Sequence, residues 1–245
     1  SDLSVIIPCF NEEKNLVEIV KQIKVVKEEN KNIFIEFIVV NNGSTDNSSS
    51  KLIKLNDQYN FKIVDLDKNL GYGGGILAGI REATCSVIAW THGDLQCDLN
   101  DVITAYKTNL IKLNNKKTIV KGKRIKRNFF DAFFSNSMAL IASLVFQKTF
   151  NEINAQPKIF SREILIYFHN APNDFSLDLF LLYVSKKAKY EIIDYPVIYK
   201  KRIAGIAKGG DSLRGKINLM VRSLIYIFKL RFRWNEIYST SNKYD

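Results

Sequence analysis

The sequence has few cysteines, no long apolar run, no internal repeat and no low-complexity tract. Its three cysteines are odd in number and lack metal-binding spacing, which predicts a reduced compartment without a disulfide framework. No uninterrupted apolar stretch reaches the roughly 18 residues that a membrane-spanning helix needs. The opening Ser1-Asp2 leads into a predicted strand, so we expect no signal peptide. A membrane region flanking this chain stays compatible with these observations.

Acidic residues are absent from one long segment and almost absent from another. Residues 102–130 contain nine Lys or Arg and no Asp or Glu, and residues 199–233 contain ten basic residues against Asp211 alone. The net charge is +11. Two basic segments far apart in sequence favour an anionic partner, which is a nucleic acid, an anionic membrane or a phosphorylated substrate. A solvated surface without a partner is the alternative interpretation.

Strand-like and helix-like patterns alternate along the chain, which is long enough to bury a large core. The predicted strands are residues 3–8, 34–40, 61–64 and 86–90. One predicted helix starts at Asn11 as its N-cap, and two others cover residues 44–55 and 75–83. This alternation predicts an α/β fold with a parallel sheet, whose ligands bind beyond the C-terminal strand ends. We expect the four following loops to converge on one crevice.

An acidic loop follows the fourth predicted strand. Asp94 and Gln96 lie two residues apart, so on an extended backbone their side chains project to the same side. A carboxylate and an amide oxygen can hold a divalent cation, Mn²⁺ or Mg²⁺, which would neutralise a diphosphate leaving group. Cys97 lies beside them, and we interpret it as a small half-buried residue rather than a reactive thiol.

Seven short segments stand out in chain order: Val5–Glu12, Asn42–Asp46, Asn69–Gly75, His92–Gln96, Val120–Arg124, Tyr195–Val197 and Lys201–Lys208. Taken in this order, they resemble the motifs of family 2 glycosyltransferases of the polyprenyl-phosphate branch. The branch includes dolichol-phosphate mannose synthases and bacterial undecaprenyl-phosphate sugar transferases. The resemblance implies a GT-A fold, which is a Rossmann-like, mostly parallel sheet with helices on both faces. It implies a catalytic domain over residues 1–205, with a nucleotide-binding half (1–100) and an acceptor half (101–205).

The resemblance also implies three sets of site residues. The nucleotide-binding set, in which Phe10 stacks on the base and Glu12 accepts ribose hydroxyls, is Pro8, Phe10, Asn11, Glu12, Asn42, Gly71, Gly74 and Asp94. The catalytic set is Asp94, Asp178 and Arg202. The set that binds an acceptor phosphate is Arg124, Arg127, Arg202 and Lys208, because guanidinium groups suit bidentate phosphate contacts.

Two positions depart from the family pattern. Asn41 and Asn42 stand where acidic residues usually precede Gly-Ser, and an amide both accepts and donates hydrogen bonds, so UDP, GDP and CDP all remain open. His92 stands where the first Asp of the metal motif belongs. A neutral imidazole can ligate Mn²⁺ and suits Mg²⁺ poorly. The favoured interpretation is that His92 supports the ion from outside the ligand set, which is Asp94 and Gln96; direct ligation is the alternative.

These inferences together predict an inverting glycosyltransferase that moves a sugar from a nucleoside diphosphate to a polyprenyl phosphate. The acceptor phosphate is already ionised near neutral pH, so it needs no general base. One alternative is transfer to a hydroxyl of a growing glycan, with Asp178 as the base; Asp178 as a structural helix residue is also open. Another is a non-catalytic, nucleotide-binding membrane protein. We expect no nucleic acid partner, because the acidic crevice loop does not fit one.

Residues 206–245 form a predicted basic helical appendage. Apolar residues recur there at helical spacing: Ile217, Met220, Val221, Leu224, Ile225 and Phe228. Basic residues flank them, which is typical of a helix lying on an anionic membrane. We therefore expect a protein bound peripherally at the cytoplasmic face of a membrane. The alternatives are a helix packed on the catalytic domain, on a second subunit of a homo-oligomer or on a membrane-protein partner.

Overall fold

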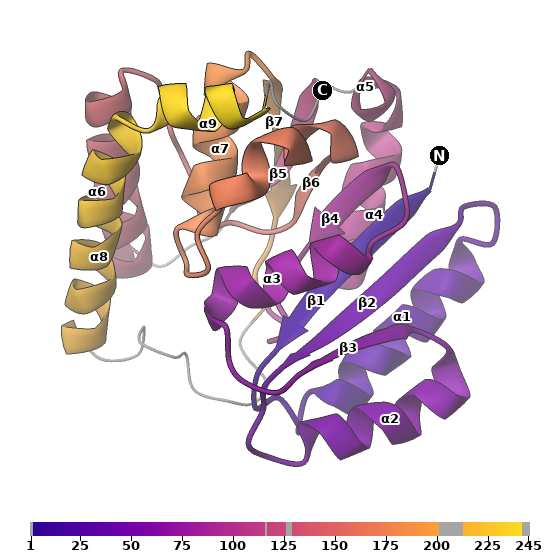
Figure 1. Ribbon diagram of the computed structural model, residues 1–245. Helices are drawn as coiled ribbons and strands as arrows, with labels where there is room; N and C mark the ends of the chain where they lie inside the picture. The colour runs from indigo at the N-terminus through magenta and orange to yellow at the C-terminus, as the bar shows by residue number, and fades with distance from the viewer. Residues whose placement is uncertain (1, 116, 126–128, 201–212, 242–245) are drawn as a thin grey trace.

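A seven-stranded sheet forms the centre of the protein (Figure 1). The computed structural model describes residues 2–115, 117–125, 129–200 and 213–241. The strands are β1 (Leu3–Cys9), β2 (Ile35–Asn42), β3 (Lys62–Leu66), β4 (Val87–Trp90), β5 (Thr118–Arg124), β6 (Lys158–Ser161) and β7 (Glu191–Val197). Their order is β3-β2-β1-β4-β6-β5-β7. Only β6 runs antiparallel to its neighbours β4 and β5 among the paired strands described, so the predicted mostly parallel sheet is confirmed.

Helices cover both faces of this sheet, as predicted. The helices are α1 (Leu16–Glu29), α2 (Ser48–Tyr59), α3 (Gly71–Glu82), α4 (Leu99–Thr108), α5 (Leu110–Asn114), α6 (Phe129–Phe146), the 3₁₀ helix η1 (Arg162–Asn170), α7 (Leu177–Lys187), α8 (Leu213–Arg231) and α9 (Trp234–Ser241). Alternate residues of a strand point to opposite faces. Val5 and Ile7 of β1 therefore pack in one cluster with α1 and α4, whereas Ile6 packs in another with α3 and α7.

The boundaries of three predicted helices were wrong by several residues. The helix expected from Asn11 begins at Leu16, and the helix expected from residue 44 begins at Ser48. Asn11 cannot be the N-cap because its φ of 56° is left-handed and its side chain turns to another loop. In contrast, the glycine-rich helix begins earlier than expected, at Gly71. Tertiary contacts of the loops decide these boundaries, and local propensity does not register such contacts.

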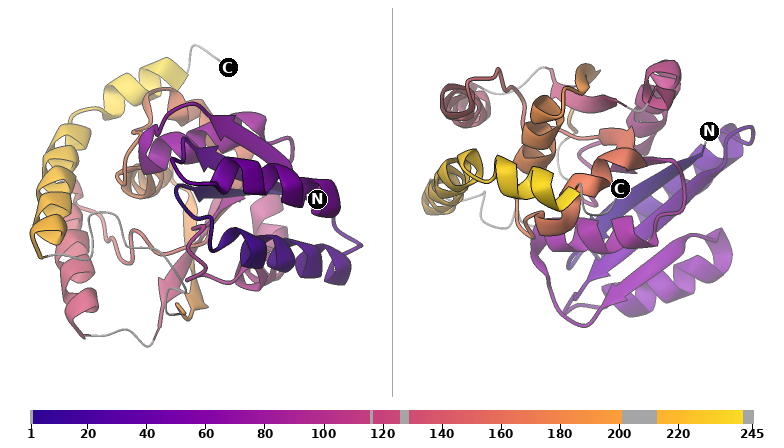
Figure 2. Two further views of the ribbon diagram at one scale, coloured as in Figure 1. Left: turned by 90° about the horizontal axis from the view of Figure 1, so that it is seen from below. Right: turned by 45° about the horizontal axis from the view of Figure 1, so that its top comes forward.

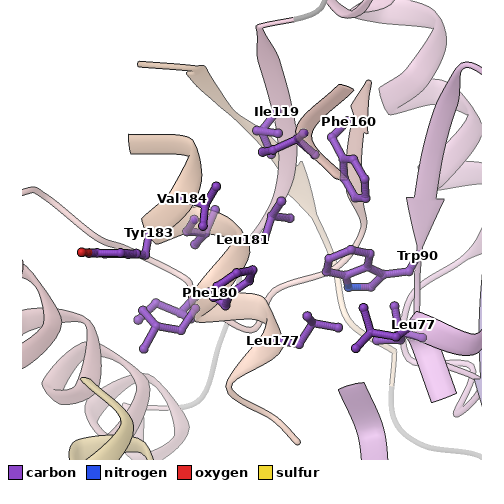
Figure 3. Close-up of a cluster of buried hydrophobic side chains, with 14 of the residues drawn as sticks. Leu77, Trp90, Ile119, Phe160, Leu177, Phe180, Leu181, Tyr183 and Val184 are labelled. Carbon is purple, nitrogen blue, oxygen red and sulfur yellow. The ribbon is translucent and has the colours of Figure 1, made fainter. Parts of the chain in front are cut away.

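The larger cluster of buried side chains connects the nucleotide-binding half to the acceptor half (Figure 3). Trp90, at the end of β4, is fully buried and meets the Phe160 ring edge-on at 5.2 Å between centroids. Leu177 and Phe180, in the first turns of α7, are also fully buried in this cluster. The packing fixes the first turn of α7 beside the end of β4. This placement brings Asp178 close to the acidic loop.

The two C-terminal helices pack against the rest of the protein. Helix α8 lies alongside α6, and α9 lies on η1 (Figures 1 and 2). Ile227, Leu230 and Ile237 are buried in the larger cluster. Among the helices described, none combines the length and apolarity that crossing a bilayer requires. The division of the chain at residue 205 stays a prediction, because residues 201–212 lie outside the described residues.

Candidate functional site

The first two motif loops meet beyond the ends of β1 and β2 and bind each other. The backbone N–H of Asn11 donates to Ser44 Oγ at 3.0 Å. The Asn11 side chain accepts from the Thr45 backbone N–H at 2.8 Å and donates to Thr45 Oγ1 at 3.0 Å. Through these contacts, Asn11 holds the two loops together. The predicted convergence of these loops is therefore confirmed, and a direct nucleotide contact by Asn11 stays a prediction.

The remaining residues of the first motif line the same end of the sheet. Pro8 and Phe10 are half-buried. The backbone N–H of Glu12 donates to Ser48 Oγ at 3.2 Å, and its carboxylate accepts from Asn15 Nδ2 at 2.5 Å. Glu12 is therefore held by its backbone and by its side chain, four residues before α1 begins.

The glycine-rich segment packs against another loop of this protein. A Cβ on Gly71 would lie 2.4 Å from the carbonyl oxygen of Asn173, and a Cβ on Gly73 equally close to that of Pro172. Gly71 also has a φ of +83°. The backbone N–H of Gly74 donates to the Asn173 carbonyl at 2.9 Å. These glycines therefore allow the segment to pack closely on residues 172–174, and the nucleotide contact expected at Gly71 and Gly74 stays a prediction.

Asn42 uses both ends of its amide to hold this glycine-rich segment. Its Nδ2 donates to the Gly71 carbonyl at 2.8 Å, and its Oδ1 accepts from the Leu70 backbone N–H at 3.0 Å. Asn42 is also buried. Its structural role explains why an amide, which can donate and accept together, suits this position. A nucleotide contact by Asn42 stays a prediction.

The acidic loop turns sharply, so the expectation of an extended backbone there was wrong. Leu95 has a φ of 60°, and the backbone N–H of Gln96 donates to Asp94 Oδ1 at 3.1 Å. Asp94 is buried. The Gln96 carbonyl instead accepts from the Lys200 backbone N–H at 2.9 Å, and its Nε2 points to the Lys200 carbonyl at 3.5 Å. Gln96 is therefore tied to the segment after β7.

His92 is the polar residue that faces Asp94. Its Nδ1 lies 4.0 Å from Asp94 Oδ2, and its side chain is 22% exposed. Burial lowers the pKa of His92, although the neighbouring carboxylate of Asp94 opposes this shift. The imidazole is consequently neutral near pH 7, which is the form that binds metal ions. A carboxylate with a neutral imidazole is a donor set that fits Mn²⁺.

Within the described residues, no three His, Cys, Asp or Glu side chains gather as a complete metal site. A cation that binds a diphosphate commonly takes only one or two ligands from the protein, and phosphate oxygens and water supply the rest. Asp94 and His92 therefore fit a divalent cation held jointly with a nucleotide.

Asp178 lies in the first turn of α7 and is almost fully buried. Its Oδ1 accepts from Gln156 Nε2 at 3.0 Å and from Trp90 Nε1 at 3.3 Å, and it pairs with Lys158 Nζ at 3.0 Å. Its Oδ2 accepts from the Tyr72 hydroxyl at 3.1 Å. Burial lowers the pKa of Lys158 to about 8, while Asp178 opposes the shift, so Lys158 is mostly charged at pH 7.

Sequence reasoning missed the partners of Asp178. Lys158 gave one usable signal, because a lysine inside the apolar strand β6 needs a buried acidic partner. Gln156 precedes a proline, which by itself indicates only a turn, yet Gln156 is fully buried. Tyr72 was hidden among the glycines of its motif. Nothing local to Trp90 indicates that its indole N–H would reach helix α7.

Arg124, at the end of β5, reaches the same region. Its Nε donates to Glu152 Oε2 at 2.6 Å, and its guanidinium lies 5.4 Å from the centre of the Tyr199 ring. The Tyr199 hydroxyl accepts from the Gln156 backbone N–H at 2.7 Å. Arg124 is thereby connected to the surroundings of Asp178. The other predicted phosphate ligands, Arg127, Arg202 and Lys208, lie outside the described residues.

The cysteines near the acidic loop are chemically quiet. Burial raises the pKa of Cys97 to about 12 and raises that of Cys9 further. Both are therefore thiols rather than nucleophilic thiolates at neutral pH. This agrees with the interpretation of Cys97 as a packing residue.

A model of the family described as Glycosyl transferase family 2 matches residues 4–171, which is more than half of the chain. The chain belongs to glycosyl transferase family 2. The matched region extends from the second residue of β1 to just beyond β6 and includes the acidic loop with Asp94. The resemblance drawn from the motifs is confirmed, and with it the identity of the chain as a glycosyltransferase.

Two of the curated relatives with similar sequences are named for a dolichyl-phosphate and an undecaprenyl-phosphate acceptor. A dolichyl-phosphate beta-glucosyltransferase, ALG5A, of Trichomonas vaginalis is 22% identical over 250 residues, covering 94% of this chain and 76% of the relative. An undecaprenyl-phosphate 4-deoxy-4-formamido-L-arabinose transferase of Salmonella choleraesuis is 25% identical over 149 residues, covering 60% of this chain and 43% of the relative.

Solved structures confirm the GT-A type of fold. Glucosyl-3-phosphoglycerate synthase of Mycobacterium tuberculosis, crystallised with Mn²⁺, UDP-glucose and phosphoglyceric acid, aligns with a TM-score of 0.70 at 15% identity. The alignment covers 94% of this chain and 79% of that chain. A crystal of the same enzyme with Mg²⁺ and UDP aligns with a TM-score of 0.64 at 15% identity, over the same shares of the two chains.

Proposed function

We propose that this glycosyltransferase moves a sugar from a nucleoside diphosphate to a polyprenyl phosphate, with inversion at the sugar carbon. The observation that carries the choice of acceptor is the saturation of Asp178. A hydroxyl acceptor needs a general base, but Asp178 Oδ1 already faces three donors, one of which is the charged Lys158. A phosphate acceptor is a nucleophile without help. The two curated relatives, which are named as dolichyl- and undecaprenyl-phosphate transferases, support the same choice.

On the donor side, Pro8, Phe10 and Glu12 hold the base and ribose, and Asp94 with His92 faces the diphosphate. A divalent cation, when bound there, supplies Lewis-acid stabilisation of the charge that develops on the departing diphosphate. The complexes of the tuberculosis enzyme with UDP and Mn²⁺ or Mg²⁺ support a divalent cation here. Which nucleoside diphosphate this chain takes is decided by the assay below.

On the acceptor side, the proposed phosphate-binding set is Arg124, Arg127, Arg202 and Lys208. Of these, Arg124 lies within the described residues. Arg124 is only 16% exposed and is oriented by Glu152. A guanidinium held in this way can offer its remaining N–H groups to a phosphate in a fixed direction. It would counter the repulsion between two anionic substrates.

The test of this function is a transfer assay with labelled sugars of UDP, GDP and CDP and a short-chain polyprenyl phosphate. We expect one donor to give a labelled lipid only when the polyprenyl phosphate and Mn²⁺ or Mg²⁺ are present. Transfer to a glycan hydroxyl without any lipid phosphate would overturn the choice of acceptor. Nucleotide binding without transfer to either acceptor would instead indicate a non-catalytic protein.

We also propose that the exposed side of α8 rests on an anionic membrane, where such an acceptor resides. Apolar residues there are 45–54% exposed and repeat at helical spacing: Ile217, Val221, Ile225 and Phe228. Leu140 and Leu144 of the neighbouring α6 are also exposed. The exposed cations Arg222, Lys229 and Arg231 flank the stripe, and their charge complements anionic headgroups. The opposite side of α8 is occupied by the protein core.

Replacing Phe228 with glutamate should weaken binding to phosphatidylserine-containing vesicles by about 10- to 100-fold, because it removes apolar burial and adds a repelled charge. Cosedimentation with vesicles measures the effect. Ile53→Glu on α2 is the matched control, because Ile53 is 55% exposed and Phe228 54%. Equal loss in both variants, or loss in neither, would rule out α8 as the membrane-contacting surface.

A further inference from the structure

A continuous chain of polar contacts runs from a buried lysine to the histidine of the acidic loop. Lys158 pairs with Asp178, Asp178 accepts from the Tyr72 hydroxyl, and that hydroxyl lies 3.2 Å from His92 Nε2. The Tyr72 and His92 rings also meet edge-on, with centroids 5.5 Å apart. The contacts of the Tyr72 hydroxyl have no role in the metal and phosphate chemistry of the proposed function. Together, the contacts in this chain bear on where the hydroxyl proton of Tyr72 and the ring N–H proton of His92 lie.

The position of that proton follows from counting donors at the Tyr72 hydroxyl. A phenol has one proton to donate and two lone pairs to accept with. Asp178 is anionic beside Lys158, so its Oδ2 accepts a hydrogen bond from the phenol O–H of Tyr72. Gln156 Nε2 donates to the Tyr72 oxygen at 3.0 Å and to Asp178 Oδ1 at the same distance. The amide orientation of Gln156 is fixed, since Asp178 can only accept.

In its remaining contact the Tyr72 oxygen therefore accepts a hydrogen bond, and His92 Nε2 donates it. A neutral imidazole carries one N–H, and a hydrogen bond at one nitrogen sets the role of the other. We infer that the Asp178–Tyr72 pair fixes His92 as the Nε2–H tautomer and directs its Nδ1 lone pair to a divalent cation shared with Asp94. His92 is then a direct ligand, in contrast to the supporting role that the sequence favoured.

The distance between the two proposed ligand atoms agrees with this assignment. Two atoms that each lie about 2.1 Å from one cation are at most about 4.2 Å apart. His92 Nδ1 and Asp94 Oδ2 are 4.0 Å apart. An Nδ1–H group facing a carboxylate would instead form a charge-assisted hydrogen bond of about 2.7–2.9 Å. The inference rests on the proposed function for the presence of the cation, and Tyr72 acts in it as a positioning residue.

The tautomer can be measured directly, because the chain has only two histidines. A long-range ¹H–¹⁵N correlation spectrum of the metal-free chain at neutral pH should show His92 protonated at Nε2. Adding Zn²⁺ alone should shift the Nδ1 resonance of His92, leave Nε2 protonated and leave the exposed His169 unchanged. An Nδ1–H tautomer, or a His92 Nδ1 that ignores Zn²⁺, would overturn the inference.

The role of Tyr72 is tested by removing only its hydroxyl. Tyr72→Phe keeps the ring, which stacks on Phe175 at 4.8 Å between centroids. We expect a mixture of His92 tautomers and an Mn²⁺ Kd raised about 10- to 100-fold, as for other losses of a partner behind a metal ligand. Tyr59→Phe, at the half-buried last residue of α2, is the matched control.

The two proposals fail in different ways. Unchanged His92 tautomer and Mn²⁺ affinity in Tyr72→Phe would refute the positioning role while leaving sugar transfer in place. A transfer assay that is negative for every acceptor, combined with the expected His92 spectra, would refute the proposed function and keep the metal site. The spectrum of the unaltered chain tests the tautomer even if Tyr72→Phe folds poorly.

Discussion

Replacing Asp94 with alanine should lower the rate of sugar transfer by about 100- to 1,000-fold, equivalent to about 3–4 kcal/mol of transition-state stabilisation. Asp94 is the buried carboxylate of the acidic loop, and it faces His92 Nδ1 at 4.0 Å. Without it, the cation loses its anionic protein ligand, and the diphosphate departs with its charge poorly neutralised. Steady-state transfer kinetics measure the loss, and calorimetry should show that nucleotide diphosphate binding no longer depends on Mn²⁺.

Asp57→Ala provides the control for this experiment. Asp57 is an exposed carboxylate on α2, so its removal changes the net charge equally and should leave the transfer rate unchanged. An Asp94→Ala variant with normal turnover and normal Mn²⁺ dependence would show that the cation is held elsewhere. If the unaltered protein transfers no sugar and Asp94→Ala still binds nucleotide and membrane, the non-catalytic alternative is favoured.

Replacing Lys158 with methionine should destabilise the protein by about 3–5 kcal/mol. Lys158 and Asp178 are 0% and 1% exposed, respectively, so the substitution leaves a carboxylate buried without its countercharge. Tyr72, Gln156 and Trp90 still donate to Asp178, which favours the lower end of the range. Urea unfolding followed by circular dichroism measures the change in free energy.

The double variant Lys158→Met with Asp178→Asn separates the charge from the packing. A neutral amide at position 178 removes the unpaired charge, so the double variant should be more stable than Lys158→Met alone. If the two variants are equally unstable, the loss of stability comes from poor packing of the methionine rather than from the unpaired charge of Asp178. If Lys158→Met is as stable as the parent, Asp178 is not held as an anion, and the proton count at Tyr72 fails with it.

These two predictions concern adjacent parts of one site with different duties. In the proposed function Asp94 is the residue that faces the donor diphosphate, whereas the Lys158–Asp178 pair holds Tyr72 and Gln156 in place. A transferase that uses a phosphate nucleophile has no need of a free base, and a carboxylate surrounded by donors is compatible with that chemistry. The buried ion pair is then a device for orientation rather than for proton transfer.

The sequence alone determined the architecture and the approximate location of the site. Alternating strands and helices predict a parallel sheet, and parallel pairing places the loops after β1, β2 and β4 at one edge. The ordered motifs identified the family, and Asp94 was recognised from its position after an apolar strand. These features are local or periodic, so they are legible without knowledge of the fold.

Only the tertiary structure decided how the site residues are used. Asn42 binds the glycine-rich segment at Gly71, the amide of Gln96 contacts the segment after β7, and Asp178 pairs with Lys158. Tyr72 meets a carboxylate 106 positions away in sequence, and Gln156 meets Tyr72 across 84 positions. No local pattern encodes such pairs, because a buried polar group is satisfied by whichever donor the packing of β4, β6 and α7 brings within about 3 Å.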